Sequence, residues 1–321
     1  MSRLSPRTRK VIRTTVTVVV VVAVAALFAI ALARNWAAVQ EQHLSFDARY
    51  VFAVVVFSAA VPVSGLLWGA ILNRLSPDHR VSARAAMALH TSSWLLKYIP
   101  GQVGSLVNKV EWGRRNGYSR VLIVITFIYE NVFLQLASIV PSVVIILATV
   151  GYAVFENNVA LLVLPLLALI PLGLVIDRRS FHRVLDLPSR RMLKQPLPEE
   201  YFLPRRTSLA LFVGFIVPRI INGIGFVLIA ATVIPVEPAD WLYLGASYAF
   251  AGAIGILAVL VPSGLGVREA VTFALLVAVG VEPAQAVIIS LLARLLSTIA
   301  DAVLALVYLV IRPPAQKEAV S

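Results

Sequence analysis

Long apolar runs separated by short polar segments dominate the chain. About 20 consecutive apolar residues span the hydrocarbon core of a bilayer, and six runs approach or exceed that length. Backbone polar groups in lipid must be satisfied within their own segment, and strand-like alternation is absent, so each run is predicted to be a helix. The predicted full spans are residues 12–33, 50–72, 121–149, 158–176, 207–234 and 284–311.

Two further apolar regions, 85–108 and 241–280, are interrupted at their centres by proline and glycine. Proline removes a backbone donor, and glycine permits a sharp turn. The arm that precedes Pro100 has about 15 residues, which as a helix reach roughly 22 Å and do not cross a bilayer. Both regions are therefore predicted to be re-entrant helical hairpins. The first arm of 241–280 is long enough to reach through, so the depth of that hairpin stays open.

The basic residues orient the spans. Of the 28 lysines and arginines, 22 lie in segments that the predicted spans place on one side of the membrane. Cytoplasmic loops carry an excess of lysine and arginine, so this side is predicted to be the cytoplasm, with both termini there. Hairpin 85–108 then enters from the cytoplasm, and hairpin 241–280 enters from outside. The basic segments are 1–13, 73–84, 109–120, 177–206 and 312–321.

The two hairpins belong to units that match at a nearly constant offset. Residues 50–150 and 207–311 each run as span, hairpin and span, but they start from opposite sides. Pro100 and Pro262 are 162 positions apart, and Glu130 and Arg294 are 164 apart. This pattern predicts an inverted-topology repeat, which in transporters places the substrate site near the membrane midplane.

Composition excludes several classes of protein. Only 14% of the residues are charged and 60% are hydrophobic, against about 25% charged residues in a soluble domain. With no cysteine, disulfide scaffolds and zinc–thiolate sites are excluded. The net charge of +12 follows mainly from topology, so nucleic acid is not an expected partner. The four histidines lack metal-ligand spacing and there is no P-loop, so we expect no metal, no other cofactor and no ATP hydrolysis by that route.

Segment 177–206 is predicted to be a basic cytoplasmic loop. It contains eight basic residues, four acidic residues and four prolines. Such a loop is attracted to anionic lipid at the cytoplasmic surface. Docking of a cytosolic partner is the alternative that remains open for this segment.

Several charged residues fall at membrane depth, where each costs at least a few kcal/mol unless it is paired or hydrated. Two interpretations stay open: pairs such as Glu130–Arg294 hold helices together, or the charges line a hydrated groove that accepts a charged headgroup. The surplus of cations beside helix ends favours an anionic group such as phosphate. The charged residues are Lys97, Glu130, Arg219, Arg268, Glu269, Arg294 and Asp301. Two predicted helix faces carry polar groups, His90/Ser93/Lys97 and Arg294/Ser297/Thr298/Asp301.

These motifs resemble the lysylphosphatidylglycerol synthase transmembrane family, a flippase-like membrane domain of bacterial and archaeal proteins. The resemblance covers nearly the whole chain and rests on segment 97–101, on Glu130, on segment 262–269 and on Arg294. The sequence departs from the family pattern at Gly104, Asn131 and Ser263, which bears on headgroup preference. The resemblance implies translocation of a phospholipid or a polyprenyl-linked lipid between leaflets. The chain is expected to be a stand-alone member without the aminoacyl-transferase domain, so synthase activity is not carried over.

We therefore expect an all-α polytopic protein of the bacterial plasma membrane that acts as a lipid flippase and not as an enzyme. Its partners would be membrane lipids, either an anionic phospholipid or a polyprenyl-phosphate-linked glycolipid. Arg268 and Arg294 would pair with the phosphate, while Glu130 and Glu269 would balance charge or gate the groove. The predicted substrate-binding residues are Lys97, Tyr98, Pro100, Gly101, Glu130, Pro262, Gly264, Gly266, Arg268, Glu269, Arg294 and Asp301.

Two alternatives come from other functional classes. The first is a non-transporting scaffold that organises a membrane glycosyltransferase or lipid synthase, with the basic segment 177–206 as its docking site. The second is an integral membrane transferase that acts on a lipid phosphate. A transferase needs a general acid or base within reach of its substrate, and Glu269 or Asp301 would serve.

Overall fold

The computed structural model describes residues 46–97, 103–151, 159–193, 196–257, 264 and 266–311. The regular elements in these ranges are all helices, which confirms the predicted all-α class. The predicted span 12–33 lies outside the described residues. So do four of the predicted site residues, Tyr98, Pro100, Gly101 and Pro262.

Four helical stretches in the described part of the chain are long and apolar enough to cross a membrane, which confirms a polytopic membrane protein. They correspond to the predicted spans 50–72, 121–149, 207–234 and 284–311. The predicted span 158–176 forms α8 (Val159–Ile176), which packs against α6. The four stretches are α3 (Ala48–Leu75), α6 (Arg120–Val150), Glu199–Ala230 and α14 (Pro283–Ile311).

The third stretch is not one continuous helix, contrary to the prediction for 207–234. It begins with the short 3-10 helix Glu199–Tyr201 and continues as α10 (Arg205–Gly214) and α11 (Ile216–Ala230), which meet at Phe215. Proline lacks an N–H and its ring clashes with the carbonyl four residues earlier. Pro218 therefore cannot donate a helical hydrogen bond to the carbonyl of Gly214, and α10 ends at that residue.

Both interrupted regions form pairs of packed helices. Region 85–108 gives α4 (Ala83–Trp94) and α5 (Val103–Arg115), and region 241–280 gives α12 (Asp240–Leu257) and α13 (Val267–Ala278). With 12 residues each, α4 and α13 extend only about 18 Å. These two arms are therefore too short to cross a bilayer.

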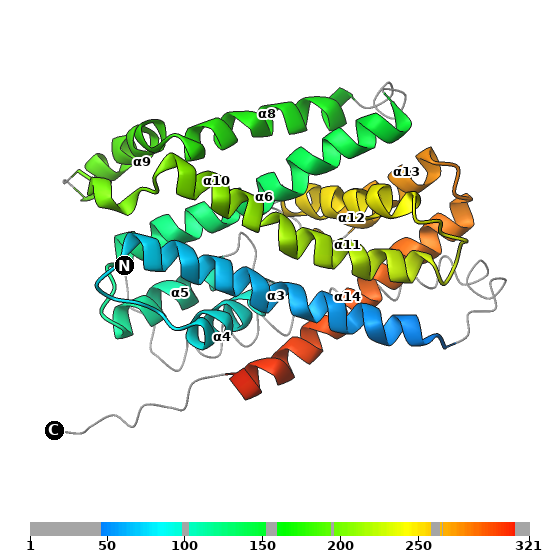
Figure 1. Cartoon of the computed structure of the whole chain (residues 1–321), viewed down its shortest axis with the longest axis horizontal. Coiled ribbons are helices and arrows are strands. Elements are labelled where there is room, and N and C mark those ends of the chain that lie inside the picture. The colour runs from blue at the N-terminus through cyan, green and yellow to red at the C-terminus, as the bar shows by residue number, and fades with distance from the viewer. Residues whose placement is uncertain are drawn as a thin grey trace, which may run out of the picture.

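The contacts between helices are those expected if a two-fold axis relates the two predicted repeat units. Helices α3 and α11 lie side by side in the middle of the molecule (Figure 1). The hairpin of each unit also contacts the last long helix of the other unit, because α4 packs on α14 and α12 packs on α6. A two-fold exchange of the units would produce these same pairings.

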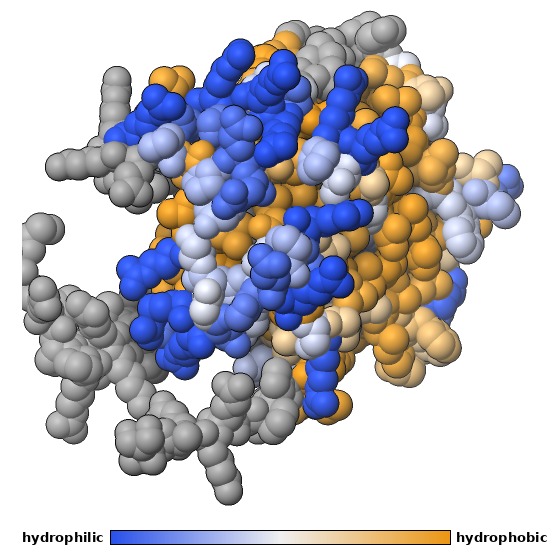
Figure 2. Space-filling view, turned by 60° about the vertical axis from the view of Figure 1, so that its left-hand side comes forward, coloured by the Kyte–Doolittle hydropathy of each residue, from blue (hydrophilic) through white to orange (hydrophobic). Residues whose placement is uncertain are grey.

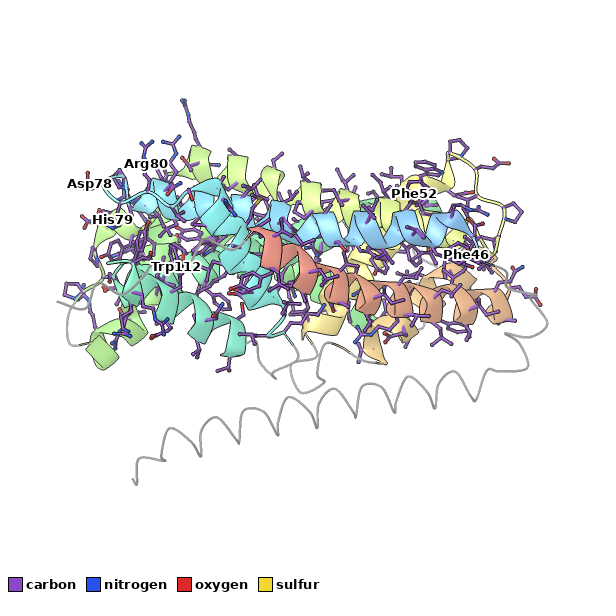
Figure 3. The ribbon with its side chains drawn as sticks, turned by 90° about the horizontal axis from the view of Figure 1, so that it is seen from below. Phe46, Phe52, Asp78, His79, Arg80 and Trp112 are labelled. Atoms are coloured by element: carbon purple, nitrogen blue, oxygen red, sulfur yellow. The ribbon has the colours of Figure 1, made fainter. Side chains whose placement is uncertain are left out.

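Polar side chains gather at one end of the helices (Figure 2). Figure 3 shows Phe46 and Phe52 near one end of α3, and Asp78, His79 and Arg80 at the other. The second end also carries the start of α6, the end of α5 and the whole of α9 (Figure 1). Figure 2, which brings this end forward, shows hydrophilic side chains on it and hydrophobic side chains along the flank. The described parts of the predicted cytoplasmic segments meet at this end.

The basic segment 177–206, predicted as a cytoplasmic loop between two spans, is largely helical. It contains α9 (Arg178–Leu193) and a short 3-10 helix, η2 (Glu199–Tyr201). The Asp177 carboxylate accepts hydrogen bonds from the backbone N–H and hydroxyl of Ser180, which stabilises the start of α9. Phe181 and Leu185, one turn apart, pack into the core and hold the helix against the bundle.

Candidate functional site

A cavity of about 470 Å³ lies between the two hairpins. Its wall is built from α3, α4, α5, α6, α11, α12, α13 and α14, so both predicted units contribute to it. Each of the two polar helix faces predicted from the sequence lies on this wall. Of the predicted site residues, Lys97, Glu130, Gly264, Arg268, Arg294 and Asp301 line the cavity, and Gly266 and Glu269 lie beside it at the start of α13.

The end of the first hairpin arm is tied to α14. Lys97 Nζ lies 2.7 Å from Oδ2 and 2.9 Å from Oδ1 of Asp301. The indole Nε1 of Trp94 donates to Asp301 Oδ1 at 3.1 Å, and Lys97 Nζ also lies 4.4 Å from the Trp94 ring centroid. The charge of Asp301 is thus compensated across the boundary between the two predicted units.

A second charged cluster joins the first hairpin to α6. Glu130 of α6 forms an ion pair with Lys109 of α5, and its Oε1 lies 2.7 Å from Nδ1 of His90 on α4. All three side chains are buried. The predicted pair Glu130–Arg294 is therefore wrong, because Glu130 is neutralised from within its own unit.

The close approach of α5 and α6 explains this pairing. A Cβ added at Gly113 would lie 2.5 Å from the side chain of Ile123, so only glycine allows these helices to come so near. Lys109 precedes Gly113 by four positions and Glu130 follows Ile123 by seven, so each pair shares one helix face. The Gly113–Ile123 contact therefore directs the Lys109 ammonium onto the Glu130 carboxylate.

The second unit holds a corresponding pair with the signs reversed. Arg294 of α14 places Nε 3.5 Å from Oε1 of Glu269 on α13. The other carboxylate oxygen of Glu269 accepts from the backbone N–H of Gly266 at 2.6 Å and so caps the first turn of α13. In each unit, the last long helix thus carries one charge that faces an opposite charge on the return arm of the hairpin.

The tip of the second hairpin requires glycine at position 264. Gly264 has φ +64°, and a Cβ there would lie 2.6 Å from the backbone oxygen of Gly255 on α12. A side chain at Gly264 would therefore push the tip away from α12. The prediction that this position matters for the hairpin turn has a direct steric reason.

Two arginines on the cavity wall have no carboxylate within 4.0 Å among the described residues, Arg219 of α11 and Arg268 of α13. The Arg268 guanidinium lies 4.2 Å from the ring centroid of Tyr248, an attractive contact that leaves its charge in place. Tyr248 is fixed by stacking on Phe57 and Phe226. The Nε of Arg219 is buried and has no hydrogen-bond partner in the described part of the chain.

The charges on the wall do not balance. Lys97, Arg219, Arg268 and Arg294 contribute four positive charges, and Glu130 and Asp301 contribute two negative charges. With His90 neutral, the excess is two positive charges. A desolvated excess of this kind is costly unless an anion or water enters the cavity.

The sequence did not reveal three residues that shape the site, Lys109, Trp94 and Tyr248. Lys109 was assigned to the cytoplasmic segment 109–120, although its spacing of four from Gly113 is a signal for a closely packed helix face. Trp94 and Tyr248 lie within apolar stretches, and their contacts with charged partners depend on helices distant in the sequence.

Comparison with known proteins adds one finding. Residues 16–305 match the family model of the lysylphosphatidylglycerol synthase TM region. A search of curated proteins finds no match to the chain. The matched range contains both hairpins and every residue that lines the cavity.

Proposed function

The chain belongs to the family of the lysylphosphatidylglycerol synthase transmembrane region, and from this premise we propose that it moves an anionic lipid between the leaflets of the membrane. The lipid would be a phospholipid or a polyprenyl-phosphate-linked glycolipid. Its headgroup would cross through the cavity while its hydrocarbon chains stay in the bilayer. We place this activity in the bacterial plasma membrane, with both termini in the cytoplasm and without ATP hydrolysis.

The observation that carries this proposal is the pair Arg219 and Arg268. Both line the cavity, and neither has a carboxylate partner among the described residues. The planar guanidinium group matches the geometry of a phosphate and binds it through two parallel hydrogen bonds. A phosphodiester between these residues would reduce the positive excess on the wall. Arg294, expected from the sequence to bind phosphate directly, also faces Glu269 and would contribute more weakly.

The size and position of the cavity support the same assignment. Its volume of about 470 Å³ falls within the roughly 300–1,000 Å³ of typical ligand sites. Both hairpins contribute residues to its wall, as expected for a site at the interface of inverted repeats. We propose that movement of one hairpin against the long helix of the other unit opens the cavity to one leaflet at a time.

The Lys97–Asp301 pair would act as the contact that such a movement breaks. It joins the end of α4 to α14 and lies on the cavity wall. An incoming phosphate would compete with Asp301 for the Lys97 ammonium. Release of the pair by the substrate would therefore couple headgroup binding to hairpin movement.

A transferase has less support from the site. The two carboxylates suggested for acid–base chemistry are both engaged, Asp301 by Lys97 and Trp94, and Glu269 by Gly266 and Arg294. We therefore propose a transporter and no enzymatic step.

A scaffold remains the second candidate because of one surface feature. Helix α9 exposes Val184 and Leu187, the latter at 71%, next to several arginines. Such an amphipathic face suits a membrane surface or a membrane-bound enzyme. A scaffold would lose enzyme recruitment when α9 is altered, whereas changes in the cavity would leave recruitment intact.

The proposal is tested with the purified full chain in liposomes. Headgroup translocation is measured for a labelled anionic phospholipid, phosphatidylglycerol, and for a zwitterionic one, phosphatidylcholine, with protein-free vesicles as background. We expect the anionic lipid to cross well above background and faster than the zwitterionic lipid. No protein-dependent translocation, or equal rates for both lipids, would contradict an anion-selective cavity.

A further inference from the structure

The cluster of His90, Lys109 and Glu130 contains one more titratable group than charge neutralisation requires. Glu130 and Lys109 already form an ion pair. His90 adds a second basic group, with Nδ1 2.7 Å from Glu130 Oε1 and 3.4 Å from Lys109 Nζ. The exposed fractions are 5% for His90, 1% for Lys109 and 2% for Glu130. A structural ion pair needs no third ionisable side chain at this depth.

Without a bound anion, the protonation state of His90 is set by the cost of burying a charge. A neutral imidazole donates from one nitrogen and accepts at the other. The tautomer with its proton on Nδ1, which lies 2.7 Å from Glu130 Oε1, leaves Nε2 as an acceptor, and Nε2 is buried without a hydrogen-bond partner among the described residues. A second proton would create an uncompensated charge beside Lys109, which costs several kcal/mol. Neutral His90 is therefore the favoured form while the cavity holds no anion.

The surroundings of His90 make its charge sensitive to what the cavity contains. Both His90 and Glu130 lie on the cavity wall, so protons have access to the cluster through the cavity. The contacting helix α3 presents no ionisable side chain there, only residues such as Ser64. The charged groups facing His90 or sharing its cavity are Lys97 of α4, Lys109 of α5, Glu130 of α6, Arg219 of α11, Arg268 of α13, and Arg294 and Asp301 of α14.

We infer that the His90–Glu130–Lys109 cluster takes up one proton when an anionic headgroup enters the cavity, so that headgroup and proton cross the membrane together. This inference rests on the proposed function and adds an energy source to it. The headgroup brings a negative charge onto a wall with a positive excess, which lowers the cost of protonating His90. The proton comes from the bulk solvent through the water in the cavity and is held at Nε2, with its charge shared electrostatically across the coupled cluster. A proton gradient would then drive the lipid in the direction of proton flow.

The inference is tested by measuring protons taken up on binding. The full chain in detergent micelles is titrated with dihexanoyl phosphatidylglycerol near pH 7.5 in two buffers of different ionisation enthalpy, and the difference in heat gives the protons bound per headgroup. The phosphodiester does not itself titrate near this pH, so any uptake belongs to the protein. We expect a measurable uptake that does not exceed about one proton per headgroup, which is the limit for a single linked site.

Two variants locate the uptake. His90→Gln keeps an amide of similar size but has no titratable group, and it should bind the lipid more weakly and take up no proton. His79→Gln is the matched control, because His79 lies outside the cavity against Tyr118 and should retain wild-type uptake. If His90→Gln does not fold, His90→Asn replaces it with the same expected loss of uptake, and a wild-type chain that binds the lipid without proton uptake would still overturn the inference.

The outcomes separate this inference from the proposed function. Binding by the wild type without proton uptake would overturn proton coupling and leave anion binding intact. Uptake that persists in His90→Gln would also overturn it, because the proton would then reside elsewhere. Absence of binding would overturn the proposed anion site, and with it the proton coupling.

Discussion

Removal of the Lys109 ammonium should destabilise the protein far more than removal of an exposed partner. Lys109→Met keeps most of the apolar stem but leaves Glu130, 2% exposed, without its main counter-charge. Loss of one partner from a buried ion pair costs about 3–5 kcal/mol. For a chain of this size, about 2 °C per kcal/mol predicts a fall in the thermal midpoint of roughly 6–10 °C. His90 offers partial compensation when protonated, so the loss should be smaller at pH 6 than at pH 8.

The measurement compares buried and exposed pairs within one protein. Thermal unfolding in detergent is followed for the wild type, Lys109→Met and the control Arg115→Met. Arg115 lies 2.9 Å from Glu111, but its side chain is 70% exposed, and exposed pairs four residues apart contribute about 0.3–0.5 kcal/mol. The double variant Lys109→Met/Glu130→Leu removes both charges and should recover at least half of the loss. Equal small effects for the two single variants would refute the buried-pair reasoning, as would a double variant less stable than either Lys109→Met or Glu130→Leu.

Three further predictions follow from close contacts and caps. Gly65→Ala should destabilise by about 1–3 kcal/mol, because the added Cβ would lie 2.9 Å from atoms of α4; Gly173→Ala, with open space around it, should leave the thermal midpoint unchanged or higher. Gly264→Ala should sharply reduce translocation, because the tip must adopt positive φ and touches α12; wild-type rates in that variant would count against a fixed tip. The pKa of Asp186 is held below its ordinary value chiefly by the backbone N–H of Leu197. The stabilisation that the ionised Asp186 gives to the contact between α9 and segment 196–203 is thus fully present above pH ~4 and is lost as the pH falls further. Limited proteolysis should show cleavage that rises on acidification in the wild type and is independent of pH in Asp186→Asn.

Much of the architecture could be predicted from the sequence because it depends on local properties. The lengths of apolar runs placed α3, α6 and α14 close to their observed bounds. The two hairpins followed from breaks at proline and glycine combined with the side of the basic segments. Both kinds of signal act within one helix, or between a helix and the membrane, and need no knowledge of tertiary contacts.

The errors arose where a neighbouring helix decides the outcome. The break at Phe215 was readable from Pro218, but the length of the apolar run concealed it. Helix α9 forms because Phe181 and Leu185 find a core to pack on, which the basic composition of the segment hid. The partner of Glu130 depends on how closely α5 approaches α6. The predicted depth of both charges in the membrane suggested Arg294, whereas the contact at Gly113 brings Lys109.

The functional residues show the same division. Their positions at membrane depth identified Lys97, Arg268, Arg294 and Asp301 as members of one polar site, and all four line the cavity. Which of them are already paired could not be read from the sequence. The structure assigns Asp301 to Lys97 and leaves Arg268 without a carboxylate among the described residues.

The most direct test of the account is phosphatidylglycerol translocation by the double variant Arg219→Gln/Arg268→Gln. Two cavity arginines are changed to neutral residues, and Arg205→Gln/Arg206→Gln removes the same charge from an exposed site as the control. Both proteins are reconstituted at equal density after thermal unfolding shows that they are folded. We predict that the cavity variant falls to the rate of protein-free vesicles while the control keeps the wild-type rate. Wild-type translocation by the cavity variant would contradict a headgroup path through this cavity.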